Sequence, residues 1–221
     1  MDPSDPAYKG QADYTPRLLS IYDRFVIGFM APRVLRTPVD SLLDQYRELT
    51  GPRHLDIGPG TGWFLDRADL PATTQITLLD PNPHVLAHCA RVLDRMKPTK
   101  VEADVLKPIP VPGPFDSAAL NMVLHCLPGP PQNKAAAIRN VAAVLGSDGV
   151  LFGASVLGRS APHSAPARLF LAIANRQGGF DNHEDSADGL RGMLAASFEE
   201  IEVTEMGSAA RFVARRPRPL P

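Results

Sequence analysis

Apolar positions along the chain follow two spacings: short continuous runs typical of buried strands, and three- or four-residue steps typical of helices. The runs predict strands at about 53–57, 76–80, 100–103, 115–123, 150–156, 198–204 and 210–214. The helical steps predict helices at about 63–68, 83–96, 132–145 and 168–176. Because strands and helices alternate, we expect an α/β fold with a parallel sheet and right-handed crossovers. The short connection between the last two strands predicts an antiparallel hairpin at one edge.

Two further helices are predicted before the first strand. One begins near Thr15, and the other follows Thr37, which can cap it, and ends near Gly51. Their apolar residues recur at helical steps: Leu18, Tyr22, Phe25 and Phe29, then Val39, Leu42, Leu43, Tyr46 and Leu49. We expect residues 14–50 to form a helical cap on a core of about residues 53–214. The cap either packs on the sheet or closes over its ligand edge, and packing is the favoured role for most of its apolar residues.

Composition limits the class of protein. The chain has 221 residues, of which 44% are hydrophobic, which suits a single α/β domain spanning residues 1–221. The formal net charge is −1 and the isoelectric point is about 6.6. Such a balance creates no overall field that would favour nucleic acid or an anionic membrane as a partner.

Further absences in the sequence predict a cytoplasmic protein without a metal. No apolar run reaches the roughly 18 residues of a membrane span, and the acidic residues 1–6 lack the apolar core of a signal peptide. Cys89 and Cys126 are the two cysteines, which favours a reducing compartment over a disulfide framework. His84, His88 and Cys89 do not complete a four-ligand zinc pattern, so no metal site is expected.

The strongest chemical signal is the stretch from His54 to Gly62, HLDIGPGTG, which predicts a buried strand, a glycine turn and the start of a helix. Glycines at alternate positions let the backbone approach a large flat ligand, and the helix start offers free N–H groups. The dinucleotide fingerprint requires a third glycine where this chain has Trp63, whose indole would obstruct that geometry. Trp63 therefore speaks against a nicotinamide oxidoreductase. A glycine turn without a ligand is the other interpretation of the motif taken alone.

Residues at the carboxyl ends of the next two predicted strands are ligand candidates, because ligands of open α/β sheets bind there. Asp80 ends the second strand, 24 positions after Asp56 (80 − 56), and is followed by Pro81. Its carboxylate can accept hydrogen bonds from ribose hydroxyls, or it can belong to a turn and helix cap. The third strand leads into Asp104 and Val105. An acid there can accept from an adenine amine, and the apolar neighbour can lie on the purine face.

The fourth predicted strand ends in a polar group and is followed by a histidine. Asn121 offers a backbone carbonyl and a polar side chain at this end. His125 can take a proton from a nucleophile near neutral pH, or it can be a helix cap or a hydrogen-bonded structural histidine. The chain lacks a Walker A sequence, so phosphoryl transfer is not supported.

These residues carry a resemblance to a known family. Five stretches resemble the class I S-adenosylmethionine (SAM) methyltransferases, specifically a bacterial small-molecule group called type 12: Tyr22–Val26, His54–Gly62, Leu78–Asn82, Leu124–Gly129 and Asn175–Phe180. The resemblance covers about residues 14–214 and implies a Rossmann-like, seven-stranded, mostly parallel sheet. The chain departs from the group at residues 29–36, where a tryptophan-containing segment is usual, which leaves room for a different substrate pocket.

The resemblance implies roles for particular residues. SAM is the expected cofactor and S-adenosylhomocysteine the product. The acid of the motif is expected beside the methionine ammonium and the glycines beside the nucleoside, and the end of the fourth strand is expected beneath the sulfonium. The expected cofactor-binding residues are Asp56, Gly58, Gly60, Gly62, Trp63, Asp80, Pro81, Asp104, Val105 and Asn121. His125 is the expected base, and Tyr14 or Tyr22 are the alternatives, as is catalysis without a base.

The sequence therefore predicts a methyltransferase acting on the O, N or aromatic C atom of a small, aromatic or indole-like natural product. Residues 121–124 lack the Asn/Asp-Pro-Pro-aromatic sequence of amide and adenine methyltransferases, and the near-neutral charge argues against tRNA or DNA. The rival interpretation is a SAM-binding partner or regulatory protein without catalysis. We expect a monomer or homodimer.

Overall fold

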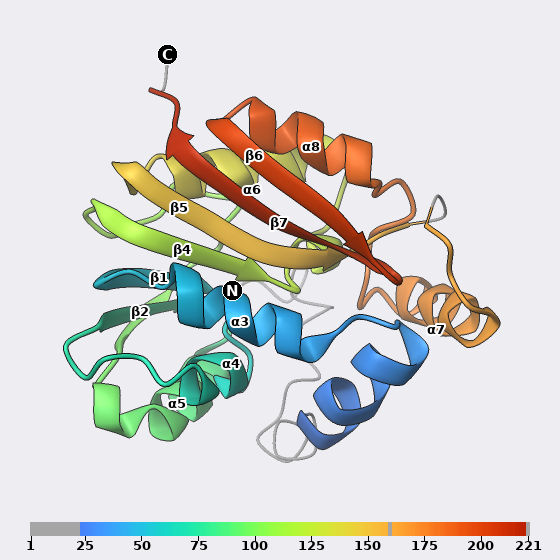
Figure 1. The fold of residues 1–221 in the computed structure, drawn as a ribbon, viewed down its shortest axis with the longest axis horizontal. Helices are drawn as coiled ribbons and strands as arrows, with labels where there is room; N and C mark the ends of the chain where they lie inside the picture. The colour runs from blue at the N-terminus through green and yellow to red at the C-terminus, as the bar shows by residue number, and fades with distance from the viewer. Residues whose placement is uncertain (1–22, 159–160, 220–221) are drawn as a thin grey trace.

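The computed structural model describes residues 23–158 and 161–219, and it contains a single mixed sheet (Figure 1). The strand order is β3-β2-β1-β4-β5-β7-β6. Neighbours from β3 to β5 pair in parallel, whereas β7 is antiparallel to both β5 and β6. The predicted fold class, including the antiparallel final hairpin, is confirmed. The strands are β1 Arg53–Ile57, β2 Gln75–Asp80, β3 Thr99–Glu102, β4 Phe115–Asn121, β5 Leu145–Val156, β6 Phe198–Met206 and β7 Ala209–Pro217.

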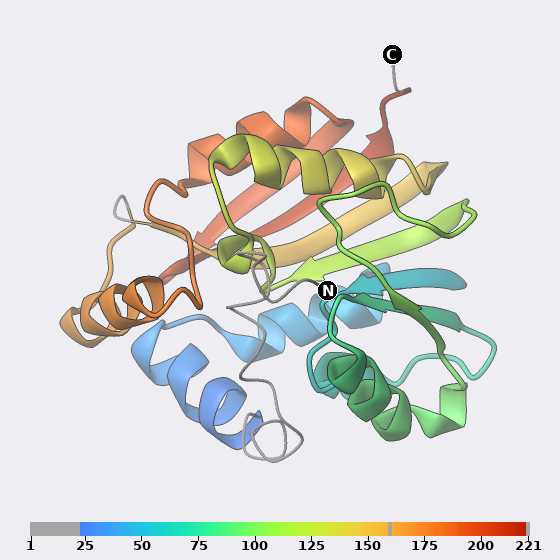
Figure 2. The same ribbon diagram turned by 180° about the vertical axis from the view of Figure 1, so that it is seen from behind.

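Helices cover both faces of the sheet, as Figures 1 and 2 show from opposite sides. Helices α3, α4 and α5 enclose one apolar core on one face, and α6 and α8 enclose a second core on the other. The elements η1 and α7 lie beyond the carboxyl ends of β4 and β5 (Figure 1). The helices are η1 Asp23–Val34 (a π-helix), α3 Val39–Leu49, α4 Trp63–Arg67, α5 Pro83–Val92, the 3₁₀ turns η2 Asp94–Met96 and η3 Leu124–Cys126, α6 Pro131–Ala142, α7 Ala165–Arg176 and α8 Ala187–Ala195.

Several boundaries differ from the predicted ones. Strand β4 ends at Asn121, because Met122 adopts a left-handed φ of +60°. Strand β5 begins at Leu145 rather than near 150, since its pairing with β4 passes through an irregularity between Phe115 and Ser117. Strand β3 ends at Glu102, one residue before the predicted end, and residues 104 and 105 lie in the loop after it.

Helix α8 was not predicted, although the sequence holds the signals for it. The Ser186 side chain accepts a hydrogen bond from the Gly189 N–H at 3.1 Å, which caps the helix. Leu190 and Leu194, one turn apart, are buried against the sheet. None of the helices in the described ranges is long and apolar enough to cross a membrane.

The described part of the predicted helical cap consists of η1 and α3, and these two helices differ in burial. Helix α3 belongs to the core: Leu42, Leu43 and Tyr46 are buried, and the Gln45 side chain donates to the Phe212 carbonyl at 3.0 Å. In η1, by contrast, Phe25 and Phe29 are 55% and 45% exposed, so these two rings do not belong to the majority of cap residues expected to pack. They stack on each other with centroids 6.2 Å apart.

Candidate active site

The glycine motif forms the turn between β1 and α4. Gly58, Gly60 and Gly62 all adopt positive φ angles, of +63°, +57° and +81°, which other residues reach only with strain. A Cβ atom at Gly58 would lie 2.7 Å from Val123, and one at Gly62 would lie 2.8 Å from the Cys89 sulfur. At Gly60 no atom of the described residues would lie within 4 Å of such a Cβ. The outer glycines are therefore needed by the fold itself, and Gly60 faces open space.

Asp56, the acid of the motif, is buried beside two further polar residues. Its Oδ2 lies 3.8 Å from His54 Nε2, while His54 Nδ1 hydrogen-bonds with the Ser117 hydroxyl at 2.7 Å. The Tyr46 hydroxyl of α3 faces both Asp56 and Asn121. Burial, followed by the Asp56 carboxylate, raises the pKa of Tyr46 well above its usual value, so the phenol stays protonated and can donate.

Asn121 lies where β4 ends, on the strand next to β1. Its side-chain Oδ1 is buried and accepts no hydrogen bond from any described residue. Leaving a buried acceptor unpaired costs about 1–3 kcal/mol, so such an atom points to a donor that the described residues do not provide. The predicted position of Asn121 at the ligand edge agrees with this geometry.

Asp80 ends β2 and is only 8% exposed. Its Oδ1 accepts from the Asn82 N–H at 2.7 Å, and the Asn82 side chain accepts from the His84 N–H at 2.9 Å and caps α5. The capping role thus belongs to Asn82 rather than to Asp80. Burial raises the pKa of Asp80 to about 7, and the Asn82 N–H partly opposes that rise. Pro81 joins the two residues.

Asp104 and Val105, which follow β3, differ in how far their side chains are exposed. Asp104 Oδ1 accepts from the Leu106 N–H at 2.9 Å, a local turn that leaves the residue partly exposed. Val105 is buried in the core under α6 and has little exposed surface, so its contact with a purine face stays a prediction. The Trp63 indole lies at the start of α4. The Arg67 guanidinium carbon lies over it, 4.5 Å from the ring centre.

His125 lies in η3, just after β4, and is almost fully buried. Its Nδ1 accepts from the Val156 N–H at 3.3 Å, which assigns the ring proton to Nε2. Burial, followed by the Lys134 ammonium, lowers the pKa of His125 to about 3. This geometry favours the structural interpretation of His125, so a role as base stays a prediction. Tyr14 and Tyr22, the alternatives, lie outside the described residues.

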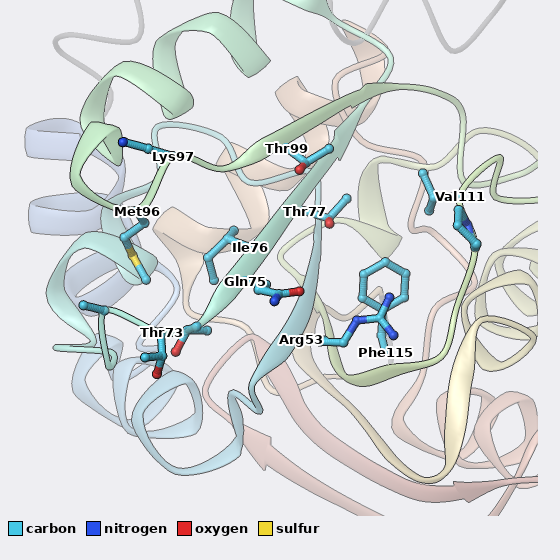
Figure 3. Close-up of a pocket in the computed structure, with 13 residues that line it drawn as sticks. Arg53, Thr73, Gln75, Ile76, Thr77, Met96, Lys97, Thr99, Val111 and Phe115 are labelled. Carbon is cyan, nitrogen blue, oxygen red and sulfur yellow. The ribbon is translucent and has the colours of Figure 1, made fainter.

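A separate cavity of about 450 Å³ opens at the opposite edge of the sheet (Figure 3). Arg53, Gln75, Thr99 and Phe115, the first residues of β1 to β4, contribute to its lining. The Arg53 guanidinium lies 5.6 Å from the Phe115 ring centre. Because the glycine motif follows the other end of β1, this cavity does not belong to the candidate site.

Comparisons with known proteins identify the family. Residues 55–151 match a family described as "Methyltransferase domain". The demethylluteothin O-methyltransferase of Streptomyces thioluteus is 40% identical over 200 residues, which cover 90% of this chain and 87% of that protein. The chain belongs to the class I SAM-dependent methyltransferases. This methyltransferase is also 36% identical, over 96% of its length and 97% of the relative's, to the physcion biosynthesis cluster O-methyltransferase of Aspergillus chevalieri.

The methyltransferase shares its fold with solved structures of low sequence identity. One is the N-methyltransferase NodS from Bradyrhizobium japonicum in complex with S-adenosyl-l-homocysteine, which is 18% identical. The TM-score is 0.56, and the match covers 80% of this chain and 83% of that one. At this identity the likeness concerns the fold alone.

Sequence reasoning missed three buried polar residues of this methyltransferase: Tyr46, His54 and Lys134. Tyr46 was taken as part of an apolar helix face, and its hydroxyl faces two candidate site residues. His54 was included in the motif without a role, and it lies beside Asp56. Only His54 could have been suspected, because a histidine inside a predicted buried strand needs polar partners.

Proposed function

We propose that this methyltransferase transfers the methyl group of SAM to a hydroxyl group of a small, partly aromatic natural product. Its O-methyltransferase relatives support oxygen as the acceptor, and the net charge of −1 supports a small molecule over nucleic acid. Residues 1–221 then form one methyltransferase domain, and a monomer or homodimer stays a prediction, as does a cytoplasmic location.

One apolar cluster carries the proposal for the acceptor. Leu35, which directly follows η1, packs with Val156 at the end of β5 and with Ala167 and Leu171 of α7. Met122, Phe170 and Phe180 are only partly buried against this cluster and therefore retain accessible apolar surface. Because Met122 directly follows Asn121, the apolar cluster adjoins the polar end of β4. An aromatic ring fits this juxtaposition, since its apolar body can lie on the cluster with a polar substituent toward β4.

The candidate site residues fit the methyl donor. Gly60 leaves room for close approach of the nucleoside, and Asp80 can accept hydrogen bonds from ribose hydroxyls. Asn121 Oδ1, which accepts no hydrogen bond from the described residues, can accept from an N–H or O–H of the ligand, and the Tyr46 hydroxyl faces the same side chain. When bound, SAM supplies a methyl group activated by its sulfonium.

The contribution of the protein is then mainly alignment of the two reactants. Holding two reactants in line is worth roughly 7–11 kcal/mol of the barrier. His125 is a weak base held by Val156, so we infer that the acceptor hydroxyl loses its proton to solvent or to a group outside the described residues. Acidic hydroxyls such as phenols suit this scheme better than alcohols do, because they ionise more readily.

The test is product formation from matched acceptors. The purified protein is incubated with SAM and with 1-naphthol, 1-naphthylamine or indole, which offer oxygen, nitrogen and carbon on similar rings. Mass spectrometry then measures S-adenosylhomocysteine and the methylated product. We expect O-methylation of the phenol. Methylation of the amine or indole alone would refute the proposed acceptor atom. Tight SAM binding in calorimetry, without turnover of a wider panel, would favour the non-catalytic SAM-binding interpretation.

A further inference from the structure

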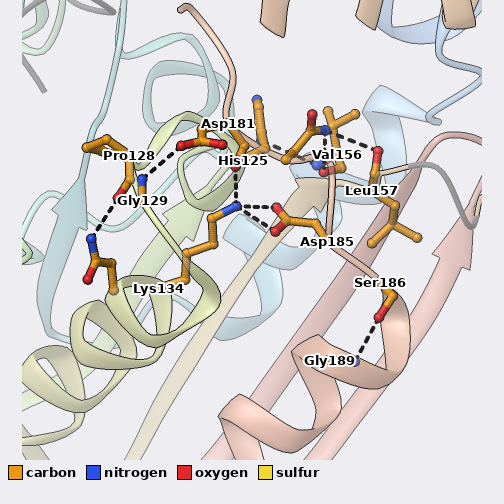
Figure 4. A network of polar contacts seen from close by, with 12 residues as sticks. His125, Pro128, Gly129, Lys134, Val156, Leu157, Asp181, Asp185, Ser186 and Gly189 are labelled. Atoms are coloured by element: carbon orange, nitrogen blue, oxygen red, sulfur yellow. Dashed lines mark hydrogen bonds and ion pairs between the residues drawn. The ribbon is translucent and has the colours of Figure 1, made fainter. Parts of the chain in front are cut away.

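Lys134 is an unusual residue for its place in the fold. It is the fourth residue of α6 and is 1% exposed. Its ammonium donates to both carboxylate oxygens of Asp185 at 2.6 Å and to the Asp181 carbonyl at 2.7 Å (Figure 4). A cation near a helix N-terminus is electrostatically unfavourable, and a buried ion pair is often no more stable than apolar residues of similar size. Stability alone therefore does not account for this lysine.

Asp181 is bound at three points, one of which is the Lys134 ammonium. Its N–H donates to the His125 carbonyl at 2.8 Å, and its Oδ2 accepts from the Gly129 N–H at 2.8 Å. Its own carbonyl accepts from Lys134, as described above. We call Lys134, Asp181 and Asp185 the Lys134 clamp. The clamp joins the segment after β4 to the segment before α8.

Phe180 immediately precedes the clamped Asp181. Its ring meets the His125 ring edge-on, with centroids 4.3 Å apart, and the Phe170 ring at 5.7 Å. Since Asp181 is held at its N–H, its carbonyl and its side chain, the backbone next to Phe180 has little freedom. The clamp therefore determines where the Phe180 ring lies in the apolar cluster.

We propose that Lys134 is a positioning residue for the methyl acceptor: through Asp181 it holds Phe180 against His125 as one wall of the acceptor pocket. The inference rests on the proposed function in one respect, that the acceptor binds at the apolar cluster. It predicts that loss of the clamp changes recognition of the acceptor and leaves SAM binding intact, because the candidate SAM residues lie at the ends of β1, β2 and β4.

The test replaces the buried pair by apolar residues, Lys134→Met with Asp185→Leu. The single change Lys134→Met would leave a buried, unpaired Asp185 and can fail to fold, whereas the double change removes both charges. Hydrogen exchange measured by mass spectrometry reports on the segments 124–129 and 180–186. We expect faster exchange there, a SAM dissociation constant within about twofold of wild type, and kcat/KM for the acceptor lowered roughly 10- to 100-fold.

Two controls distinguish a loss of positioning at the acceptor site from a general destabilisation of the fold. The exposed Asp188–Arg191 pair on α8, at 2.7 Å, is removed in the same way (Asp188→Leu with Arg191→Met) and should change none of these quantities. Phe180→Ala should lower kcat/KM for the acceptor as the clamp variant does, with SAM affinity unchanged.

Wild-type kcat/KM in the clamp variant, unchanged exchange in both segments, or a parallel loss of SAM affinity would each overturn the inference. If the wild-type enzyme methylates only amines, the proposed hydroxyl acceptor fails, and the clamp is then tested on the amine. If it methylates no acceptor at all, the proposed function and this inference both fail.

Discussion

Asp80→Asn should make the ligand-free protein more stable while weakening its binding of SAM. Burial raises the pKa of Asp80 from 3.8 to about 7, so the ionised carboxylate is disfavoured in the folded state. At about 1.4 kcal/mol per pKa unit this rise corresponds to at most about 4 kcal/mol above pH 7. The amide carries no charge, and its oxygen can still accept from the Asn82 N–H. We expect a gain of roughly 1–4 kcal/mol at pH 8.5.

The sign of the pH dependence follows from the same pKa. Because the folded pKa lies above the unfolded one, the folded state binds the extra proton between about pH 4 and 7. This group therefore lowers the free energy of unfolding as the pH rises through that window, and its effect is complete above pH 7. The free energy of unfolding of Asp80→Asn should therefore lack this fall between about pH 4 and 7. Urea unfolding of both proteins at pH 5 and pH 8.5 measures it.

Binding of SAM should change in the opposite direction. Replacing a charged acceptor of the ribose hydroxyls by a neutral one should cost about 1.5–3 kcal/mol, a roughly 10- to 150-fold rise in the dissociation constant measured by calorimetry. Asp188→Asn, whose side chain is 94% exposed, is the control and should change neither quantity appreciably. Equal pH dependence of stability in wild type and Asp80→Asn would refute the burial argument. Unchanged SAM affinity would remove Asp80 from the site.

Three further changes test the remaining site residues. Gly60→Val should abolish SAM binding in calorimetry; circular dichroism should show a folded but less stable protein, because no atom of the described residues lies within 4 Å of the added Cβ while the φ of +57° strains a β-branched residue. His125→Asn should keep kcat within about tenfold and should not alter its pH profile between pH 5 and 8, because the pKa of His125 is about 3; a loss of about 10²–10⁴-fold would instead restore the role as base. Tyr46→Phe should weaken SAM binding several-fold in calorimetry, because Asp56 loses its hydroxyl partner; unchanged affinity would make Tyr46 a packing residue.

The sheet could be predicted because its signals are local. Most of the parallel strands contain a short apolar run next to glycine, proline or an acid, and the crossover rules then limit the topology. What the sequence does not contain is the pairing between strands. The early start of β5 at Leu145 depends on its irregular pairing with β4, which no local pattern reveals. The end of β3 at Glu102 depends likewise on its partner Asp80.

For the candidate site too, local sequence predicts some residues and leaves others unrecognised. Gly60, Asp80 and Asn121 follow from strand ends, which the sequence marks. The state of His125 does not, because its position in the sequence says nothing about the Val156 N–H or about burial. Lys134 lies in an alanine-rich helix, where a lysine is usually a solvated residue. Only the fold shows that residues 181 and 185 enclose it.

Helix α3, in the N-terminal segment, contributes to the candidate site from within the core and not as a separate lid. A detachable lid would carry its polar groups to the ligand from outside, but α3 buries Leu42, Leu43 and Tyr46 in the core. Its Tyr46 hydroxyl faces Asp56 and Asn121 from inside the protein. Removing residues before Pro52 would therefore expose apolar core and deprive both residues of that hydroxyl, so such a truncation cannot separate SAM binding from folding. Single substitutions such as Tyr46→Phe can, because the ring still packs on Phe64 and Phe152.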